Sequence, residues 1–515
     1  MTQPVKAVVI VGGGSAGWLT ASLIAARHQA RMKAGGLSVT LIESPDIRII
    51  GVGEGTWPTL RSSLERIGVS ETALFRECDA AFKQGGKFAG WTTGAQDDAY
   101  YHPLMIPQGF SQVNLVPHWQ REGRGRSFCD FVTPQGRLCD EGLAPKTITH
   151  AEYKGSANYA YHLDAGKFAP FLARHCTEKL GVRHVLADIV QVNQRDSGDI
   201  EGVLTKQAGE VLGDLFIDCS GFSALLIGKT LGVGFKGCGD VLFCDTALAV
   251  QVPFDTPDAP MASQTISTAH EAGWTWDICL PTRRGVGYAY SSRHQSEEAA
   301  RETLLRYIGP EHKGLPVRKI PIHAGHRETF WKRNCVAVGL ASGFLEPLES
   351  SAIVLVELSA KLIAEQMPAC REVMDIIAKR FNEVTMYRFG RIVDFLKLHY
   401  VLTKRTDTAF WRDNVEPATV PDRLRDMLTL WKYQSPWFFD ELDRLEEVFP
   451  AASYQYVLYG MGFRTEVAPE EMLDTAAAAS RLVSENERQT SELRRRLPKN
   501  RDLLSKIYQY GLQPV

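Results

Sequence analysis

The sequence has no apolar run long enough to cross a membrane and almost no net charge. Of its 515 residues, 58 are Lys or Arg and 60 are Asp or Glu, so the formal net charge is −2. A membrane helix needs about 20 consecutive apolar residues, and nucleic-acid binding is usually accompanied by a basic patch. No charged leader precedes the first strand-like segment. These absences favour a cytoplasmic protein that binds neither nucleic acid nor membrane.

Paired cysteines are also absent. The ten cysteines include no Cys-x-x-Cys pair and no Cys/His spacing typical of zinc ligands, so we expect mostly buried, reduced thiols and no metal. The hydrophobic content of 44% and charged content of 23% are those of an ordinary globular protein. At this length we expect a large nucleotide-binding body followed by an appended region.

The nucleotide-binding signal stands almost at the N-terminus. Residues 7–11 are apolar and mostly β-branched, and they lead into the pattern G-x-G-x-x-G at Gly12, Gly14 and Gly17. Such a strand, tight turn and helix bind a pyrophosphate through a close backbone approach and the positive end of the helix. A second strand is predicted at 38–42, and Glu43 follows it as the acidic residue that would bind ribose hydroxyls.

Two other interpretations of this glycine cluster are open. It could be a plain glycine-rich turn, although the strand, the helix and Glu43 all agree with a dinucleotide site. The overlapping Gly13-x-Ser15-x-Gly17 also matches a hydrolase nucleophile elbow. That elbow normally follows several strands of its sheet, whereas here the chain has only begun.

Two further strand-to-glycine turns are predicted at 215–221 and 335–343. Three such turns suit FAD, which is long and is held by separate parts of one sheet. Helices dominate from Ser350 onward. Two apolar helix faces are predicted there, one formed by Ile353, Val356, Ala360 and Ile363, the other by Val373, Ile377, Phe381, Val384 and Tyr387.

On pattern alone, two later segments have ordinary structural interpretations. Lys83 would be a solvated charge, and the tryptophan pair Trp274 and Trp276 would be packed in a core. Together with other motifs, however, they resemble one family, the flavin-dependent halogenases of the tryptophan-halogenase type. The motifs are GGGSAGW at 12–18, GVGEGTWP at 51–58, AFK at 81–83, GWTWDI at 273–278 and FLEPLESS at 344–351.

This resemblance implies an α/β fold similar to flavin monooxygenases. It would have a Rossmann-type FAD-binding domain, a mixed substrate-side sheet and a C-terminal helical region. We expect residues 1–350 to form the FAD-binding and halogenation core with the inserted sheet, and residues 351–515 to form a mainly helical region that completes the substrate chamber. The implied partners are a small aromatic substrate and a separate flavin reductase, with homodimer formation left open.

The resemblance also implies the reaction. Reduced FAD, dioxygen and halide, either bromide or chloride, would give hypohalous acid, which passes through a tunnel to Lys83. The lysine would hydrogen-bond the acid or carry the halogen as a haloamine. Glu349 would orient the acid and accept the proton of the ring intermediate, and Glu346 is the less favoured carboxylate.

The same resemblance assigns the remaining site residues. Halide would bind at the backbone of Ser351 and Ala352. Trp274 and Trp276 would keep the substrate away from the flavin, and His102 and Leu104 would lie on the substrate side. FAD contacts would come from Gly13, Ala16, Ser44, Ile47, Ile50, Val52, Gly55, Ile189, Leu340 and Ile353.

The substrate side departs from tryptophan halogenases. Leu104 replaces an aromatic residue of the indole sandwich, and residues 437–454 contain no convincing counterpart of the segment that holds the amino-acid group. A buried zwitterion needs fixed partners, so indole or an indole derivative is favoured over free tryptophan. The alternatives are a single-component FAD aromatic monooxygenase that hydroxylates its substrate, and a flavin-binding protein without turnover.

Overall fold

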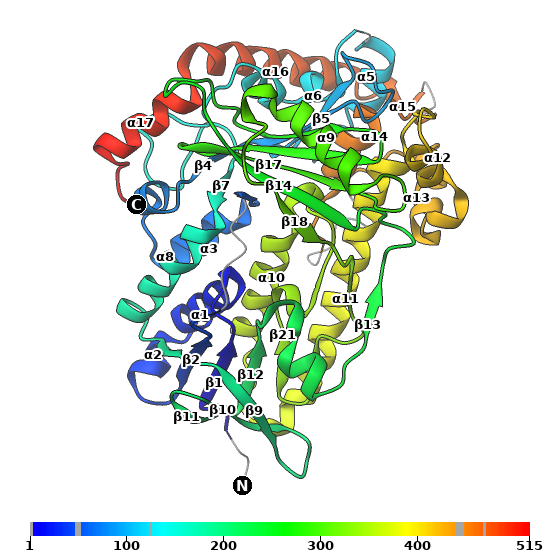
Figure 1. Cartoon of the computed structure of the whole chain (residues 1–515). Helices are drawn as coiled ribbons and strands as arrows, with labels where there is room; N and C mark the ends of the chain where they lie inside the picture. The colour runs from blue at the N-terminus through cyan, green and yellow to red at the C-terminus, as the bar shows by residue number, and fades with distance from the viewer. Residues whose placement is uncertain (1–3, 47–52, 124, 439–446, 467–469) are drawn as a thin grey trace.

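The first strand lies at the centre of a six-stranded sheet (Figure 1). The computed structural model describes residues 4–46, 53–123, 125–438, 447–466 and 470–515. The strand order is β20-β21-β12-β1-β2-β8, and neighbours are parallel except β20 with β21. The strands are β1 (Ala7–Val11), β2 (Ser38–Glu43), β8 (Arg183–Leu186), β12 (Leu215–Asp218), β20 (Trp331–Lys332) and β21 (Cys335–Ala337).

The three strand-to-glycine segments predicted from the sequence meet in this sheet. β1 pairs with β12, and β12 pairs with β21, so their carboxyl ends lie side by side at one edge. Residues 8–11 of β1 are all buried, as expected for a parallel strand covered on both faces. The predicted Rossmann-type domain is therefore confirmed.

Helices and a small antiparallel sheet surround this sheet. α1 (Ser15–Arg27) packs against α8 (Ala165–Glu178) and α10 (Ser351–Glu365). The predicted apolar face of α10 is buried as expected. The antiparallel sheet lies at the lower edge of the molecule in Figure 1. It consists of β9 (Ile189–Gln194), β10 (Ile200–Thr205) and β11 (Gly209–Leu212).

A seven-stranded mixed sheet forms the other half of the molecule. Its order is β18-β14-β17-β16-β15-β5-β6, with β15 parallel to β5 and the other pairs antiparallel. α9 (Glu297–Ile308) covers β14 and β17 with an apolar face. The strands are β5 (Gly85–Ala89), β6 (Ala99–Pro103), β14 (Thr246–Pro253), β15 (Thr265–Ala269), β16 (Gly273–Cys279), β17 (Arg283–Tyr290) and β18 (Arg318–Pro321).

Two three-stranded sheets complete the β structure. The sheet β3-β7-β4 consists of β3 (Gly53–Gly55), β7 (Ala160–Asp164) and β4 (Ala81–Lys83), and all its pairs are antiparallel. β3 also contacts β16 and β17 of the large mixed sheet. The other sheet consists of β13 (Phe235–Gly237), β19 (Gly325–Arg327) and β22 (Gly343–Phe344).

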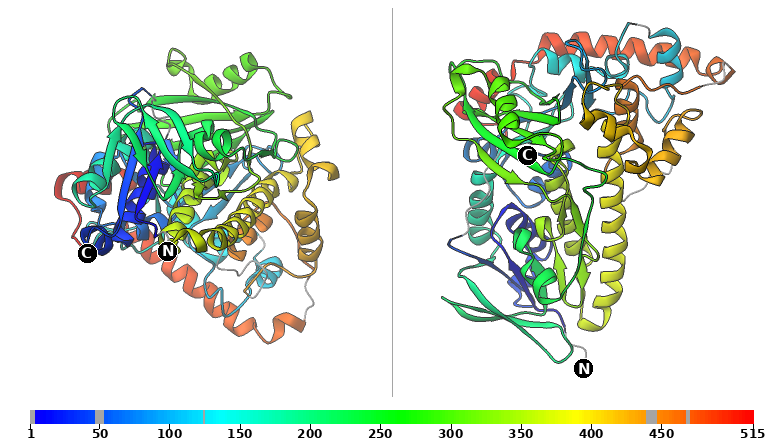
Figure 2. Two further views of the ribbon diagram at one scale, coloured as in Figure 1. Left: turned by 90° about the horizontal axis from the view of Figure 1, so that it is seen from below. Right: turned by 45° about the vertical axis from the view of Figure 1, so that its right-hand side comes forward.

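The long helix α11 (Arg371–Val401) runs along one side of the molecule (Figure 2). The face predicted for it from the apolar pattern is confirmed in part, because Phe381 is buried and Ile377 packs half-buried against the core, whereas Val373 is exposed. Residues 391–400 are buried without interruption. Charged residues of this stretch are paired inside the protein, as Arg391 is with Glu447 at 3.0 Å, so apolar periodicity cannot reveal the buried face.

The last part of the chain returns over the mixed sheet. α14 (Ala451–Gly460) packs against β6. α16 (Ala476–Arg496) packs against α6 (Phe128–Val132) and α7 (Gln135–Asp140), and α17 (Asn500–Tyr510) packs against α4 (Glu71–Glu77) (Figure 1). In the described part of the chain, no helix is both long and apolar enough to cross a bilayer. The remaining helices are α2 (Gln29–Lys33), α3 (Thr59–Arg66), α5 (Val116–Glu122), α12 (Ala409–Val415), α13 (Asp422–Trp431) and α15 (Glu470–Leu473).

Candidate active site

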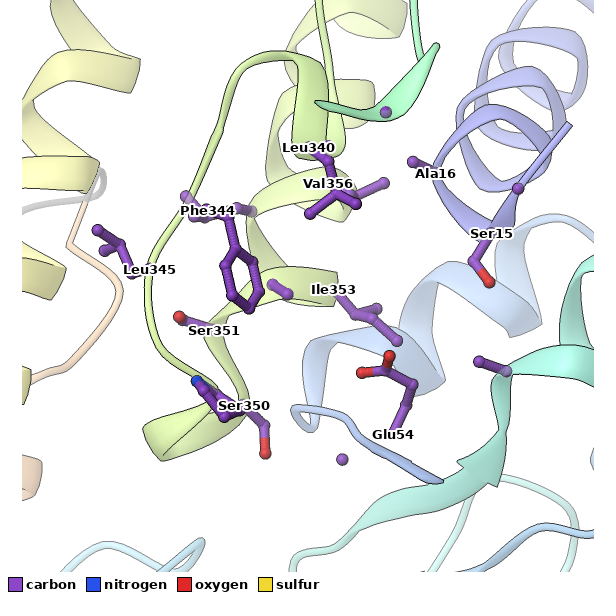
Figure 3. A pocket seen from close by; sticks show the side chains of 18 of the residues that line it. Ser15, Ala16, Glu54, Leu340, Phe344, Leu345, Ser350, Ser351, Ile353 and Val356 are labelled. Atoms are coloured by element: carbon purple, nitrogen blue, oxygen red, sulfur yellow. The ribbon is translucent and has the colours of Figure 1, made fainter. Parts of the chain in front are cut away.

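One cavity of about 750 Å³ joins the nucleotide-binding sheet to the mixed sheet. Figure 3 shows Ser15 and Ala16 of α1 facing Ile353 and Val356 of α10 across it. With one exception, Gly17, every predicted site residue that the structure describes lines this cavity. These residues are Gly12, Gly13, Gly14, Ala16, Glu43, Ser44, Gly55, Lys83, His102, Leu104, Ile189, Trp274, Trp276, Leu340, Glu349, Ser351, Ala352 and Ile353. Three predicted FAD contacts, Ile47, Ile50 and Val52, lie outside the described residues.

The glycines of the first turn differ in what surrounds them. A Cβ on Gly12 would lie 2.1 Å from the carbonyl oxygen of Cys219, and one on Gly17 would lie 1.9 Å from that of Gly12. These two glycines are therefore required for the turn and for close helix–strand packing. A Cβ on Gly14 would meet nothing within 4 Å, so the backbone there faces open space that a ligand can fill.

The N-terminus of α1 is suited to an anion. The helix has no side-chain cap and no acidic residue in its first turn, so its first N–H groups remain available. Glu43 ends β2 beside it, and its carboxylate lies 3.0 Å from Nε2 of His184. A Cβ on Gly13 would lie 2.1 Å from Cδ of Glu43, so Gly13 makes room for this carboxylate at the edge of the cavity.

Lys83 ends β4 at the other end of the cavity, and its exposed fraction is only 5%. Its Nζ donates a hydrogen bond to Oγ of Ser350 over 3.1 Å. Burial lowers the pKa of Lys83 from 10.5 to about 8, although the charge of Glu349 opposes the change. The solvated surface position suggested by pattern alone is therefore wrong. The cause is tertiary, because neighbouring elements cover the end of β4.

Glu349 is held by two histidines. Nδ1 of His102 lies 2.8 Å from Oε1 of Glu349, and Nε2 of His399 lies 3.3 Å from the same oxygen. Burial alone would raise the pKa of Glu349, but the two histidines outweigh it, so the pKa lies well below its ordinary value. Glu349 is therefore a fixed carboxylate acceptor beside the buried amine of Lys83.

The backbone at this carboxylate adopts an uncommon conformation. Glu349 has φ 62° and Ser350 has φ 55°, which are left-handed values for two consecutive non-glycine residues. Such conformations persist only where the surroundings hold them, and they cluster at functional sites. One restraint is Trp57, whose Nε1 donates to the carbonyl oxygen of Glu349 over 2.8 Å.

Sequence reasoning missed part of this arrangement. His399 lies on α11, and its Nδ1 is 2.6 Å from the hydroxyl of Tyr100 on β6. The hydroxyl of Tyr100 therefore positions the His399 ring, whose Nε2 lies beside the carboxylate of Glu349. Neither residue stood out in the sequence, because neither belongs to a recognisable motif. Trp57 was visible only as part of the GVGEGTWP motif.

Ser351 and Ala352 begin α10, directly after the left-handed pair. Both line the cavity. The helix has no side-chain cap and no acidic residue in its first turn, so its first N–H groups are free of intrahelical partners. This arrangement can hold an anion.

Trp274 and Trp276 project from β16, and their ring centroids are 6.2 Å apart. Both line the cavity while remaining almost entirely buried. Gly287 on the neighbouring strand β17 leaves space for Trp276, because a Cβ there would lie 2.0 Å from its ring. The pair is part of the core, as pattern alone suggested, and it also forms part of the cavity wall.

The substrate-side residues lie close to Glu349. His102 contacts the carboxylate, and the backbone N–H of Leu104 donates to Oε1 of Gln135 over 2.7 Å. Leu104 presents an aliphatic side chain to the cavity. Within the described residues, Lys83 is the only lysine or arginine among those that line the cavity.

A dinucleotide-binding turn that shares a cavity with a buried amine and a carboxylate is typical of a dinucleotide-dependent oxidoreductase. The protein comparisons agree. Residues 7–478 match the family model described as tryptophan halogenase. The chain is similar to the crystal structure of a tryptophan halogenase from Shewanella frigidimarina NCIMB 400, with 46% identity, a TM-score of 0.97 and 99% of each chain covered.

Two further relatives support this class. The tryptophan 6-halogenase SttH of Streptomyces toxytricini is 34% identical over 88% of this chain and 89% of its own length. BrvH, a flavin-dependent halogenase from Brevundimonas sp. BAL3, is 34% identical with a TM-score of 0.86, over 98% of this chain and 99% of that chain. The chain belongs to the tryptophan halogenase family, and it is a flavin-dependent halogenase.

Proposed function

We propose that the enzyme uses reduced FAD, dioxygen and bromide or chloride to halogenate an electron-rich arene, such as indole or an indole derivative. The proposal rests on one observation. The cradle of Gly12 to Ala16 and the buried amine of Lys83 line the same cavity, so an oxidant formed at the cradle would have a route to the amine.

The residues at the nucleotide end fit FAD. The open space at Gly14 and the uncapped N-terminus of α1 suit its pyrophosphate, and Glu43 suits its ribose hydroxyls. Ala16, Ser44, Gly55, Ile189, Leu340 and Ile353 would line the rest of its length. When bound, reduced FAD would supply hypohalous acid from dioxygen and halide, and halide would bind at the N–H groups of Ser351 and Ala352.

Lys83 positions the hypohalous acid. A pKa of about 8 leaves the amine mostly protonated at neutral pH, so Nζ can donate to the oxygen of the acid as it donates to Ser350 here. This donation makes the halogen more electrophilic and stabilises the departing oxygen. We therefore favour a hydrogen-bonded acid over a haloamine.

Glu349 accepts the proton that the arene loses. After the ring carbon bonds to the halogen, the ring is a cation that must release the proton of that carbon. Glu349 is ionised and held by His102 and His399, so it can stabilise the cation and take the proton. Trp274 and Trp276 would keep the arene at the Lys83 side of the cavity.

The charged residues that line the cavity favour an uncharged arene over a zwitterion. Free tryptophan carries a carboxylate that needs a fixed cation when buried. Among the described lining residues, the only candidate is Lys83, which the chemistry already uses. We therefore propose indole or an indole derivative as the substrate. In the proposed division, residues 1–350 carry Lys83, Glu349 and most FAD contacts, and residues 351–515 complete the substrate chamber and add Ser351, Ala352 and Ile353 to the cavity.

The test is a reaction with a separate flavin reductase, NADH, FAD, indole and either bromide or chloride, analysed by mass spectrometry. We expect a product with the isotope pattern of the added halogen. A hydroxylated product that forms without halide would overturn the proposal in favour of the aromatic monooxygenase. The absence of product from indole and from a panel of larger arenes would overturn it in favour of a flavin-binding protein without turnover.

A further inference from the structure

An indole ring of the protein itself lies at the amine end of the cavity. Trp57 is only partly buried, lines the cavity, and donates its Nε1–H to the carbonyl oxygen of Glu349 over 2.8 Å. Its ring packs against Phe449 and His102, with centroid separations of 5.1 and 6.0 Å. Trp57 is therefore an indole held at the backbone of Glu349, the residue whose carboxylate we propose as the proton acceptor.

The segment Glu349–Ser350 forms hydrogen bonds with both the Trp57 ring and the Lys83 amine. Trp57 bonds to Glu349, and Lys83 bonds to Ser350, the next residue. Gly55 precedes Trp57 by two positions, and a Cβ on it would lie only 3.1 Å from Nζ of Lys83. The backbone that carries Trp57 thus passes directly beside the amine.

We propose that Trp57 is a halogenation site of the enzyme itself, modified when no arene substrate is bound. This inference rests on the proposed function, which supplies hypohalous acid at Lys83. Indole is the most electron-rich ring among the protein side chains, so an oxidant that meets no substrate would react with an indole held beside the amine. Trp57 is bonded to Glu349, the residue next to the Ser350 that Lys83 contacts.

The reaction balances as an electrophilic substitution. A ring carbon of Trp57 forms a bond to the halogen of the hypohalous acid, and the halogen–oxygen bond breaks. The oxygen leaves as water after it receives a proton from the Lys83 ammonium, and the ring C–H proton passes to Glu349. The ring loses two electrons, the halogen gains them, and proton transfer from Glu349 restores Lys83 through water.

Among the described residues, two other tryptophans line the cavity and provide an internal comparison. Trp274 and Trp276 also line it, but they project from β16 and share no backbone segment with Lys83. Label on Trp57 therefore reports oxidant delivered at Lys83. Label on Trp274 or Trp276 would instead report oxidant that reacts before it reaches the amine.

The sequence makes Trp57 easy to assay. Trypsin cleaves after Arg48 and Arg61, and in the peptide 49–61 that results, Trp57 is the only aromatic residue. This peptide also contains no Met, Cys or His. A bromine isotope doublet on this peptide can come only from the Trp57 ring.

The experiment uses the full-length enzyme with reductase, NADH, FAD, bromide and catalase, without any arene. We expect the doublet on peptide 49–61, and we expect added indole to suppress it. In K83M the label should fall by about a hundredfold, the lower end of what a positioned catalytic group contributes. K87M is the matched control and should keep the wild-type label, because Lys87 is paired with Asp140 and does not line the cavity. W57F lacks the indole ring, so its peptide 49–61 should show no bromine doublet.

The experiment distinguishes a failure of the Trp57 assignment from a failure of the proposed function. If indole is brominated but peptide 49–61 stays unlabelled when indole is left out, the assignment of Trp57 is wrong and the proposed function stands. Equal labelling of Trp57 and of exposed tyrosines, or labelling unchanged in K83M, would also overturn the assignment, because free hypobromous acid would explain both. If neither indole nor any protein residue is brominated, the proposed function itself is wrong.

Discussion

Replacement of Lys83 by methionine should lower the halogenation activity and raise the stability of the folded protein. Burial lowers the pKa of Lys83 from 10.5 to about 8, and a displacement of this size corresponds to about 3 kcal/mol of free energy. At pH 7 the lysine is charged in both the folded and the unfolded states, so the folded state carries this cost in full. Methionine removes it, while Ser350 loses a hydrogen bond worth about 1 kcal/mol.

The net gain expected for Lys83→Met at pH 7 is therefore about 2 kcal/mol. With an unfolding entropy of about 2.1 cal/mol/K per residue, this gain raises Tm by about 2 °C. The sign of the pH dependence follows from linkage. Between pH 8 and 10.5 the unfolded state binds more protons than the folded state, so wild-type stability rises with pH in this window, and the advantage of the variant shrinks.

Whereas Tm should rise, the halogenation activity of Lys83→Met should fall. We expect arene halogenation to fall by at least about a hundredfold, the lower end of the contribution of a positioned proton donor, while reduced flavin is still oxidised by dioxygen. The assays are thermal unfolding at pH 7 and pH 9.5, product mass spectrometry, and flavin absorbance. Lys87→Met is the control, since this lysine is partly exposed and paired with Asp140. Halogenation at the wild-type rate, or a lower Tm at pH 7, would refute the reasoning.

Three further substitutions test other parts of the site. Glu349→Gln removes the proton acceptor but keeps a side chain of the same shape, so arene halogenation should fall by about a hundredfold while flavin oxidation continues. Gly55→Ala places a Cβ 2.4 Å from Oγ of Ser350 and 3.1 Å from Nζ of Lys83; displacing the amine should lower arene halogenation by at least about tenfold. Gly14→Ala meets no protein atom within 4 Å, so Tm without FAD should stay unchanged while FAD affinity, measured by fluorescence titration, falls by at least about tenfold.

Each of these three has its own contradicting result. Full activity in Glu349→Gln would mean that another group takes the ring proton. Normal activity in Gly55→Ala would show that Lys83 need not stay in its observed position. Unchanged FAD affinity in Gly14→Ala would show that the backbone at Gly14 does not contact FAD closely. A matched comparison for Gly14 is Gly17→Ala, where the Cβ would lie 1.9 Å from a backbone oxygen and should destabilise the fold itself.

The sequence alone determined the nucleotide-binding half of the protein. The glycine turn at Gly12 and the strands that follow are local features, because sharp turns, apolar strands and helix starts depend on neighbouring residues. The resemblance carried by the longer motifs also identified Lys83 and Glu349, and both line the cavity.

Only the tertiary structure decided how the reaction site is held. His399, which lies beside Glu349, is bonded to Tyr100 on a strand about 300 residues away, and no spacing along the chain encodes such a meeting. Trp57 bonds to a backbone carbonyl, which has no side-chain signature. The buried stretch 391–400 of α11 was not predicted, because its interior charges are paired across the fold. Periodicity reports local amphipathicity, whereas burial and pKa depend on which distant segments pack together.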